Sequence, residues 1–247
     1  MVMGIFTPTS GTMSPEFQKT ESAGLDAGAL LRLLQLVSPA LPIGAFAYSH
    51  GLEWARDAGW VRDDRGVEAW IGGLLRQVWS RLDVPILRRM SDAVRTEDET
   101  ALLEWSELLH ASRETAELRA EDRLMGRALA RLLADMGLEG AARWIPDDRC
   151  SLPLLWACAA VHWNVPLSAA ATGLLWTYVE HQVAAAVKLV PLGQTAGQLV
   201  LARIGEGIPT AVTRGLALTD VEIGATAPAL AIASCLHETQ YTRLFRS

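Results

Sequence analysis

Cysteine, lysine and net positive charge are all scarce in this sequence of 247 residues. Its three cysteines (Cys150, Cys158 and Cys235) are an odd number without close spacing, which fits free thiols in a reducing compartment. The formal net charge of -6 argues against a general nucleic-acid binder, whose footprint is a basic patch. The first residues lack a basic region followed by an apolar run, so we expect a cytoplasmic protein without a secretory signal.

Charged side chains are also missing from residues 150–179. An apolar stretch longer than about 18 residues would ordinarily suggest a membrane span. Here the run is divided into two shorter helices by Pro153, His162, Asn164 and Pro166. We therefore expect a buried helical hairpin in a protein that does not enter a membrane.

Strand signals are almost absent, whereas apolar residues make up 50% of the chain, enough for a substantial core. Residues 1–28 are rich in Ser, Thr, Pro and Gly without periodicity, which predicts a disordered N-terminal tail. From residue 29 onward helical spacing dominates, and no linker is long enough to separate domains. The sequence thus predicts an all-α fold: a flexible tail over 1–28 and a single-domain bundle of about ten helices over 29–247.

One helix is marked by both its cap and its apolar face. Asp63 or Asp64 can cap it, and apolar residues recur at i, i+3, i+4 and i+7 from Val67 to Leu82. Further helices are expected over residues 99–110, 113–136, 152–163, 167–187, 195–204, 210–216 and 229–240.

The segment 36–54 interrupts this helical pattern with two prolines and two glycines. Pro39 and Pro42 disfavour a helical conformation in the residue before each, so the preceding helix ends near Val37, and Gly44 permits a tight turn. The turns that follow carry an aromatic and polar set that suits recognition better than core packing: Phe46, Tyr48, His50, Glu53 and Trp54.

Lys188 is one of only two lysines among 22 basic residues, and the other, Lys19, lies in the N-terminal tail. Lys188 sits inside an apolar run that ends at Pro191. From this context alone, a lysine that snorkels to the surface near a helix end is favoured by about two to one. The alternative is a lysine placed where its charge is needed.

The last eleven residues, 237–247, combine apolar and basic side chains. Tyr241, Leu244 and Phe245 alternate with Arg243 and Arg246, and Tyr and Arg are enriched in interface hot spots. Such a segment either orders on meeting a partner or folds back onto its own domain. The residues alone leave both alternatives open.

These segments resemble the UreF family of urease accessory proteins. The residues that carry the resemblance are Pro42-Ile43-Gly44 with an aromatic two positions later, Gly51-Leu52-Glu53, Val187-Lys188 with Val190-Pro191 and Gln194, Glu117-Leu118-Arg119 with Gly126, and the segment 237–247. They occur in the family's order from the start of the domain to its end.

The resemblance implies an assembly chaperone and not an enzyme. Such a protein dimerises, joins the companion scaffold (UreD or UreH) and the GTPase UreG, and helps to activate apo-urease by GTP-dependent nickel insertion. It implies no stably bound cofactor, since the complex handles nickel transiently. Lys188 is expected to act at the GTPase step, and the C-terminal tail to contact the scaffold. The candidate partner-binding residues are Phe46, Tyr48, His50, Glu53, Arg119, Lys188, Gln194, His237, Glu238, Tyr241 and Arg243.

Four arginines recur every four residues, at Arg119, Arg123, Arg127 and Arg131, and acidic residues lie among them. A solvated, salt-bridged helix face is favoured over a binding stripe by about three to one. Only Arg119 is expected to be a binding residue, because it belongs to the motif that resembles the family.

The alternative function is a nickel-binding carrier. Cys158 and His162 are spaced four apart on one helix, and His237 is a further candidate ligand. Two ligands make half a metal site at best, so structural roles are favoured by about five to one for each pair. No phosphate-binding GxxxxGK[ST] loop exists, which excludes a P-loop GTPase, and no other enzyme signature is present.

Overall fold

The computed structural model describes residues 25–247, and its regular elements are all helices. They are α1 (Ala27–Leu36), α2 (Leu52–Asp57), α3 (Asp64–Leu74), α4 (Val84–Arg95), α5 (Glu99–Ala111), α6 (Ala116–Asp135), α7 (Leu152–His162), α8 (Leu167–Leu189), α9 (Gln194–Gly205), α10 (Ile208–Ala217) and α11 (Pro228–His237). Short 3-10 turns lie at Ala45–Ala47, Glu139–Trp144 and Asp220–Glu222. A π-helix, Leu75–Asp83, joins α3 to α4 without a break, so these three form one rod. The described part therefore confirms an all-α bundle of about ten helices.

Several helix boundaries follow from local capping. The side chains of Asp63, Thr115 and Ser151 accept hydrogen bonds from backbone N–H groups in the first turns of α3, α6 and α7. Asp26 does the same for α1, so that helix begins at Ala27, two residues before the expected start of the domain. The rest of the expected tail, residues 1–24, lies outside the described residues.

The rod of α3, the π-helix and α4 is longer than the sequence pattern suggests. The apolar pattern marks this helix only as far as Leu82, but the helix continues to Arg95. The π-helix adds an extra residue to each of its turns, so the apolar face shifts and the 3.6-residue periodicity no longer marks the continuation. At the end of the chain, α11 stops at His237 instead of residue 240, because the segment beyond it turns back onto the body.

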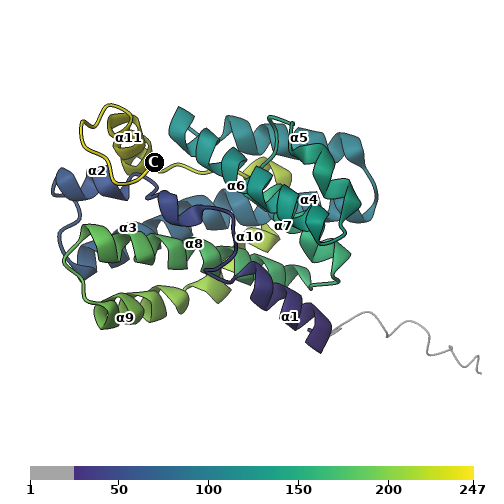
Figure 1. Ribbon diagram of the computed structural model, residues 1–247, viewed down its shortest axis with the longest axis horizontal. Coiled ribbons are helices and arrows are strands. Elements are labelled where there is room, and N and C mark those ends of the chain that lie inside the picture. Colours follow the sequence, from purple (N-terminus) through teal and green to yellow (C-terminus); the bar gives the residue numbers. More distant parts are fainter. Residues whose placement is uncertain (1–24) are drawn as a thin grey trace, which may run out of the picture.

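The long apolar stretch forms two consecutive and mostly buried helices, α7 and the first part of α8, as the sequence predicts. Helix α8 runs through the body against α9 and α10, while α7 packs against α4 and α6 (Figure 1). Most side chains of α7 and of the middle of α8 are buried. No helix among residues 25–247 is both long and apolar enough to cross a membrane.

One glycine of the family-like motif has a packing role. A Cβ atom at Gly126 would lie 2.5 Å from the backbone carbonyl carbon of Ser151. Only glycine therefore allows α6 to approach the start of α7 this closely. That contact sets the orientation of α6, and with it the face of α6 that lies against α2, α11 and the end of the chain.

Candidate functional site

The segment between α1 and α2 is shaped by residues with a left-handed backbone. Gly44, His50 and Gly51 have φ angles of 76°, 53° and 72°. Glycine adopts such angles without strain, and Gly51 also faces α11, where a Cβ atom would lie 3.1 Å from Cβ of Ala233. These turns bring the start of α2 against α11 and leave Phe46 in solvent, 73% exposed.

Glu53, in the first turn of α2, is the anchor of the C-terminal segment. Its side chain is buried, yet its Oε1 accepts a hydrogen bond from the backbone N–H of Leu244 (2.7 Å). Its Oε2 accepts a hydrogen bond from the N–H of Phe245 (2.8 Å) and lies 3.2 Å from Nε2 of His237. A carboxylate is rarely buried unless it is hydrogen-bonded. The N–H groups of the segment therefore stabilise the buried carboxylate of Glu53, and this carboxylate in turn fixes the backbone of the segment.

Two acidic side chains of α6 face the same segment. Oε2 of Glu117 lies 2.7 Å from Nδ1 of His237, and its Oε1 accepts a hydrogen bond from Nη1 of Arg243 (2.9 Å). One turn later, Oε2 of Glu121 accepts a hydrogen bond from the hydroxyl of Ser247 (2.6 Å). Because Glu117 and Glu121 are four residues apart, they share one face of α6.

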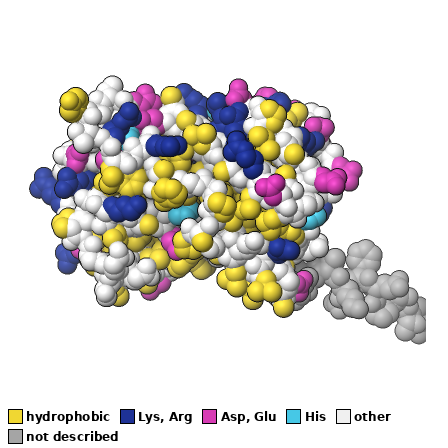
Figure 2. Space-filling model, in the orientation of Figure 1, with side chains coloured by type: hydrophobic (Ala, Val, Ile, Leu, Met, Phe, Trp, Pro, Cys, Tyr) yellow, Lys and Arg dark blue, Asp and Glu magenta, His cyan; other side chains and the backbone are white. Residues whose placement is uncertain are grey.

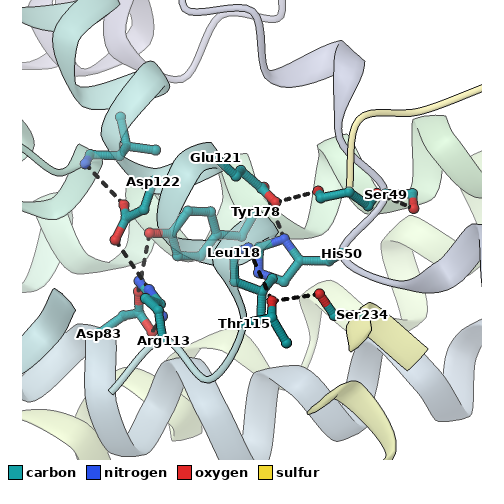
Figure 3. A network of polar contacts seen from close by, with 12 residues as sticks. Ser49, His50, Asp83, Arg113, Thr115, Leu118, Glu121, Asp122, Tyr178 and Ser234 are labelled. Carbon is teal, nitrogen blue, oxygen red and sulfur yellow. Dashed lines mark hydrogen bonds and ion pairs between the residues drawn. The ribbon is translucent and has the colours of Figure 1, made fainter. Parts of the chain in front are cut away.

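Glu121 also holds the turn that precedes α2. Its Oε1 lies 2.9 Å from Nδ1 of His50 (Figure 3). Burial alone would lower the pKa of His50, but the adjacent Glu121 carboxylate outweighs it and raises that pKa. The preceding residue, Ser49, donates both its backbone N–H (2.8 Å) and its hydroxyl (2.5 Å) to the carbonyl oxygen of Ser247.

The C-terminal segment therefore folds back onto its own domain, which settles one of the two alternatives that the sequence left open. Its side chains divide into two sets. Phe245 and Ser247 are buried, whereas Tyr241 is fully exposed and Leu244 is 66% exposed. Of the two alternatives, the structure therefore shows the second: buried carboxylates order the segment within its own chain.

Three of the expected contact residues are buried in the chain. Tyr48 and Glu53 are each 5% exposed and His237 is fully buried, so none of the three presents its side chain to a partner in this conformation. Glu53 instead accepts hydrogen bonds from the backbone of the segment and lies beside His237. Tyr241, Glu238 and Arg243 do face solvent, and so do Phe46, Lys188 and Gln194.

Lys188 meets the C-terminal segment, which its sequence position did not suggest. Its Nζ lies 5.6 Å from the centroid of the Phe245 ring, within the range of a cation–π contact. Lys188, Phe46 and Gln194 also line a groove of about 300 Å³ between α8, α9 and the turn before α2. Three segments that are far apart in the chain thus meet on one face.

Sequence reasoning missed a buried ionic network beside this site. The guanidinium of Arg113 donates Nη2 to Asp83 (2.6 Å) and Nε to Asp122 (3.1 Å), and the hydroxyl of Tyr178 donates to Asp83 (3.2 Å) (Figure 3). Burial raises the pKa of Asp122, while the two neighbouring carboxylates raise that of Arg113 against the effect of burial. The π-helix ends at Asp83, so the network ties this irregular turn to α6 and α8.

Two of the four arginines in the stripe on α6 form ion pairs within the chain. Arg123 and Arg127 both donate to Asp148, at 3.1 and 3.0 Å. These contacts confirm the expected salt-bridged face for that pair. Arg119 donates its Nη1 to the backbone carbonyl of Arg113 (2.6 Å) and is partly buried, so it supports the loop that holds the ionic network.

The residues considered for a nickel carrier do not form one site, because Cys158 and His162 line a hollow beside α5, whereas His237 lies against Glu53 and Glu117. Both ring nitrogens of His237 face carboxylates, and burial raises the pKa of Cys158 to about 11, which keeps its thiol protonated. Within residues 25–247, no group of three or more His, Cys, Asp or Glu side chains is arranged to hold a metal. The geometry therefore gives the carrier hypothesis no support.

Comparison with known proteins gives consistent matches over most of the chain. The family model UreF matches residues 61–205. The chain is 51% identical over 216 residues to the urease accessory protein UreF of Alkalilimnicola ehrlichii, covering 87% of this chain and 95% of that protein. It is 49% identical over 219 residues to the UreF of Pseudomonas putida (89% and 98% covered). It is 46% identical over 218 residues to the urease accessory protein UreF 2 of Brucella anthropi (88% and 96% covered).

Proposed function

The chain belongs to the UreF family, and from that premise we propose that it is an assembly chaperone of urease maturation. In this proposal it joins the companion scaffold (UreD or UreH) and the GTPase UreG, and couples GTP hydrolysis to nickel insertion into apo-urease. It contributes binding surfaces and not catalytic groups. Nickel is the cargo of the assembled complex and is handled transiently.

The observation that carries this proposal is the two-sided C-terminal segment. Buried acids of α2 and α6 hold its backbone and its inner side chains, while Tyr241 and Leu244 point into solvent. Helix α11, which leads into the segment, exposes Ile232 and Leu236 as well. Apolar and aromatic side chains presented on a fixed backbone lose little conformational freedom on binding, which suits a protein interface. We assign this surface to the scaffold.

A second surface lies where Lys188 and Gln194 border the groove between α8 and α9. We assign it to the GTPase. Phe245 connects the two surfaces, because its backbone is held by Glu53 and its ring lies beside the ammonium group of Lys188. Undocking of the C-terminal segment would therefore also remove a neighbour that fixes the position of Lys188.

The homodimer is assigned to α1. This helix exposes Leu30, Leu31 and Leu34, and an open apolar hollow of about 530 Å³ lies between α1 and α8, with Trp176 in its wall. Figure 2 shows hydrophobic side chains gathered at the place where Figure 1 has α1. A contiguous apolar patch of this kind marks an association surface, and a second copy of the chain would cover it.

Binding of the purified scaffold to surface variants tests the proposal. Tyr241→Asp and Leu244→Asp should each weaken binding by at least about tenfold, since each puts a charge into an apolar contact. The matched control is Val221→Asp, at an exposed valine of the 3-10 turn Asp220–Glu222, which should bind as wild type does. Equal affinity for all four proteins would contradict the assignment. The assignment of Lys188 is tested by GTP turnover of UreG in the presence of wild type or Lys188→Ala. Equal turnover with both proteins would contradict a role of Lys188 at the GTPase step.

A further inference from the structure

The groove between α8 and α9 has opposite charges at its two ends. Glu180 and Lys188 both belong to α8 and both line the groove. They are eight residues apart, which corresponds to about 12 Å along a helix. Ala184 lies between them, and Leu201 of α9 lines the same groove, so the middle of the groove is apolar. Figure 2 shows basic, acidic and histidine side chains among hydrophobic ones over α8.

One oxygen of the Glu180 carboxylate lacks a hydrogen-bond partner in the described part of the chain. Its Oε2 is shielded from solvent and has no hydrogen-bond partner among residues 25–247. Burial accordingly raises the pKa of Glu180. The side chain is half-buried, but a carboxylate oxygen that is shielded from water and unpaired is costly, and a cation that pairs with the carboxylate offsets that cost.

The neighbouring side chains do not supply this cation. His181 also lines the groove, but burial lowers its pKa to about 4, so it is neutral at physiological pH. The ammonium group of Lys188 lies at the other end, beside the ring of Phe245. The groove is therefore complementary to a segment that brings a cation to one end and an anion to the other.

We propose that this groove binds a segment of the partner GTPase that carries a basic side chain, paired with Glu180, and an acidic side chain about 12 Å away, paired with Lys188. On a helix the two would be separated by two turns. Glu180 is thus a specificity-determining residue at the surface assigned above to the GTPase. The inference rests on the proposed function, because it takes the GTPase as the occupant.

The charge pattern argues against other occupants. A phosphate-rich partner such as a nucleic acid or an anionic membrane would be repelled by Glu180, and the groove offers it only one cation. A second copy of this chain has its own apolar surface on α1. An ordered pair of opposite charges selects the direction in which a peptide segment can lie.

The test is the affinity of purified UreG for the complex of this chain with its scaffold. Glu180→Gln keeps the shape of the side chain and removes its charge, so we expect at least about tenfold weaker binding. The matched control is Glu104→Gln, an exposed glutamate of α5, which should bind as wild type does. Lys188→Gln should also weaken binding, and the double variant should show the product of the two losses, because sites about 12 Å apart act independently.

Each outcome separates the two claims. Glu180→Gln should unfold no more easily than wild type, because Oε2 has no hydrogen bond within the described part to lose. If UreG binds Glu180→Gln as tightly as wild type while Lys188→Gln binds weakly, the inference is wrong and the proposed function stands. If Glu180→Gln changes only the self-association of the chain, the groove binds a second copy and the inference is again wrong. If UreG does not bind the wild-type complex, the proposed function itself fails.

Discussion

Substitution of Glu53 by alanine should release the C-terminal segment without unfolding the domain. The carboxylate accepts the backbone N–H groups of Leu244 and Phe245 at 2.7 and 2.8 Å. A hydrogen bond to a charged group contributes about 1.5–3 kcal/mol, so the loss of two removes about 3–6 kcal/mol from docking of the segment. His237 also loses the contact of its Nε2 with Glu53.

Other contacts of the segment remain, among them the Arg243–Glu117 hydrogen bond and the backbone hydrogen bond from Arg246 to Ala47. Ser49 and Glu121 still hold Ser247, and burial of the Phe245 side chain contributes about 1.5–3 kcal/mol. The domain as a whole has a separate core, and segments such as this one open locally at lower free energy than global unfolding. The loss therefore falls on the segment itself.

Native-state hydrogen exchange measures this directly. In Glu53→Ala the amides of Leu244 and Phe245 should exchange at least about a hundredfold faster, since 1.4 kcal/mol corresponds to a factor of ten. Amides in the middle of α8 should keep their protection. Glu238→Ala, at an exposed glutamate just beyond α11, is the control and should leave both regions unchanged. Unchanged protection at Leu244 and Phe245 in Glu53→Ala would refute the anchoring role of Glu53.

Three further predictions concern the body of the protein. Gly126→Ala should lower the free energy of unfolding by at least about 1–3 kcal/mol, because its Cβ atom would meet the backbone of Ser151. Gly73 has open space around it, so Gly73→Ala should raise that free energy by about 0.5–1 kcal/mol. Urea unfolding compares the two variants. Arg113→Met should lower the free energy of unfolding by about 3–5 kcal/mol in the same assay, because Asp83 and Asp122 would stay buried without their cation. The control is Arg56→Met, at an exposed ion pair, and an equal loss in both variants would contradict a structural role of the network. Burial lowers the folded-state pKa of His181 to about 4, so the unfolded state binds the proton more readily and stability should fall as the pH drops from about 6.5 to about 4. His181→Gln should lose that part of the pH dependence in unfolding curves.

Much of the fold could be predicted from the sequence because its signals are local. Three of these signals each act within a few residues: the helix cap at Asp63, the helix-breaking prolines at 39 and 42, and the breaks in the apolar run of 150–179. The π-helix that ends at Asp83 could not be found in this way, because an extra residue per turn leaves the composition unchanged and shifts only the phase.

The candidate site was predicted by residue type but not by arrangement. Glu53, His237 and Arg243 carried the resemblance to the family, yet only the folded chain shows that the first two are buried and hold the C-terminal segment against the domain. The same is true of Lys188 and Phe245, which are 57 positions apart in the sequence and meet only because the segment turns back. Long-range contacts between polar groups leave no periodic signal.

Nickel-dependent urease activity tests the central claim most directly. A cognate urease gene cluster would be expressed with and without this chain, and both the activity of the purified urease and its bound nickel would be measured. The account predicts active, nickel-loaded urease only when the chain is present, with activity reduced by Tyr241→Asp and Glu180→Gln. Equally active, equally loaded urease without the chain would contradict its role as an assembly chaperone.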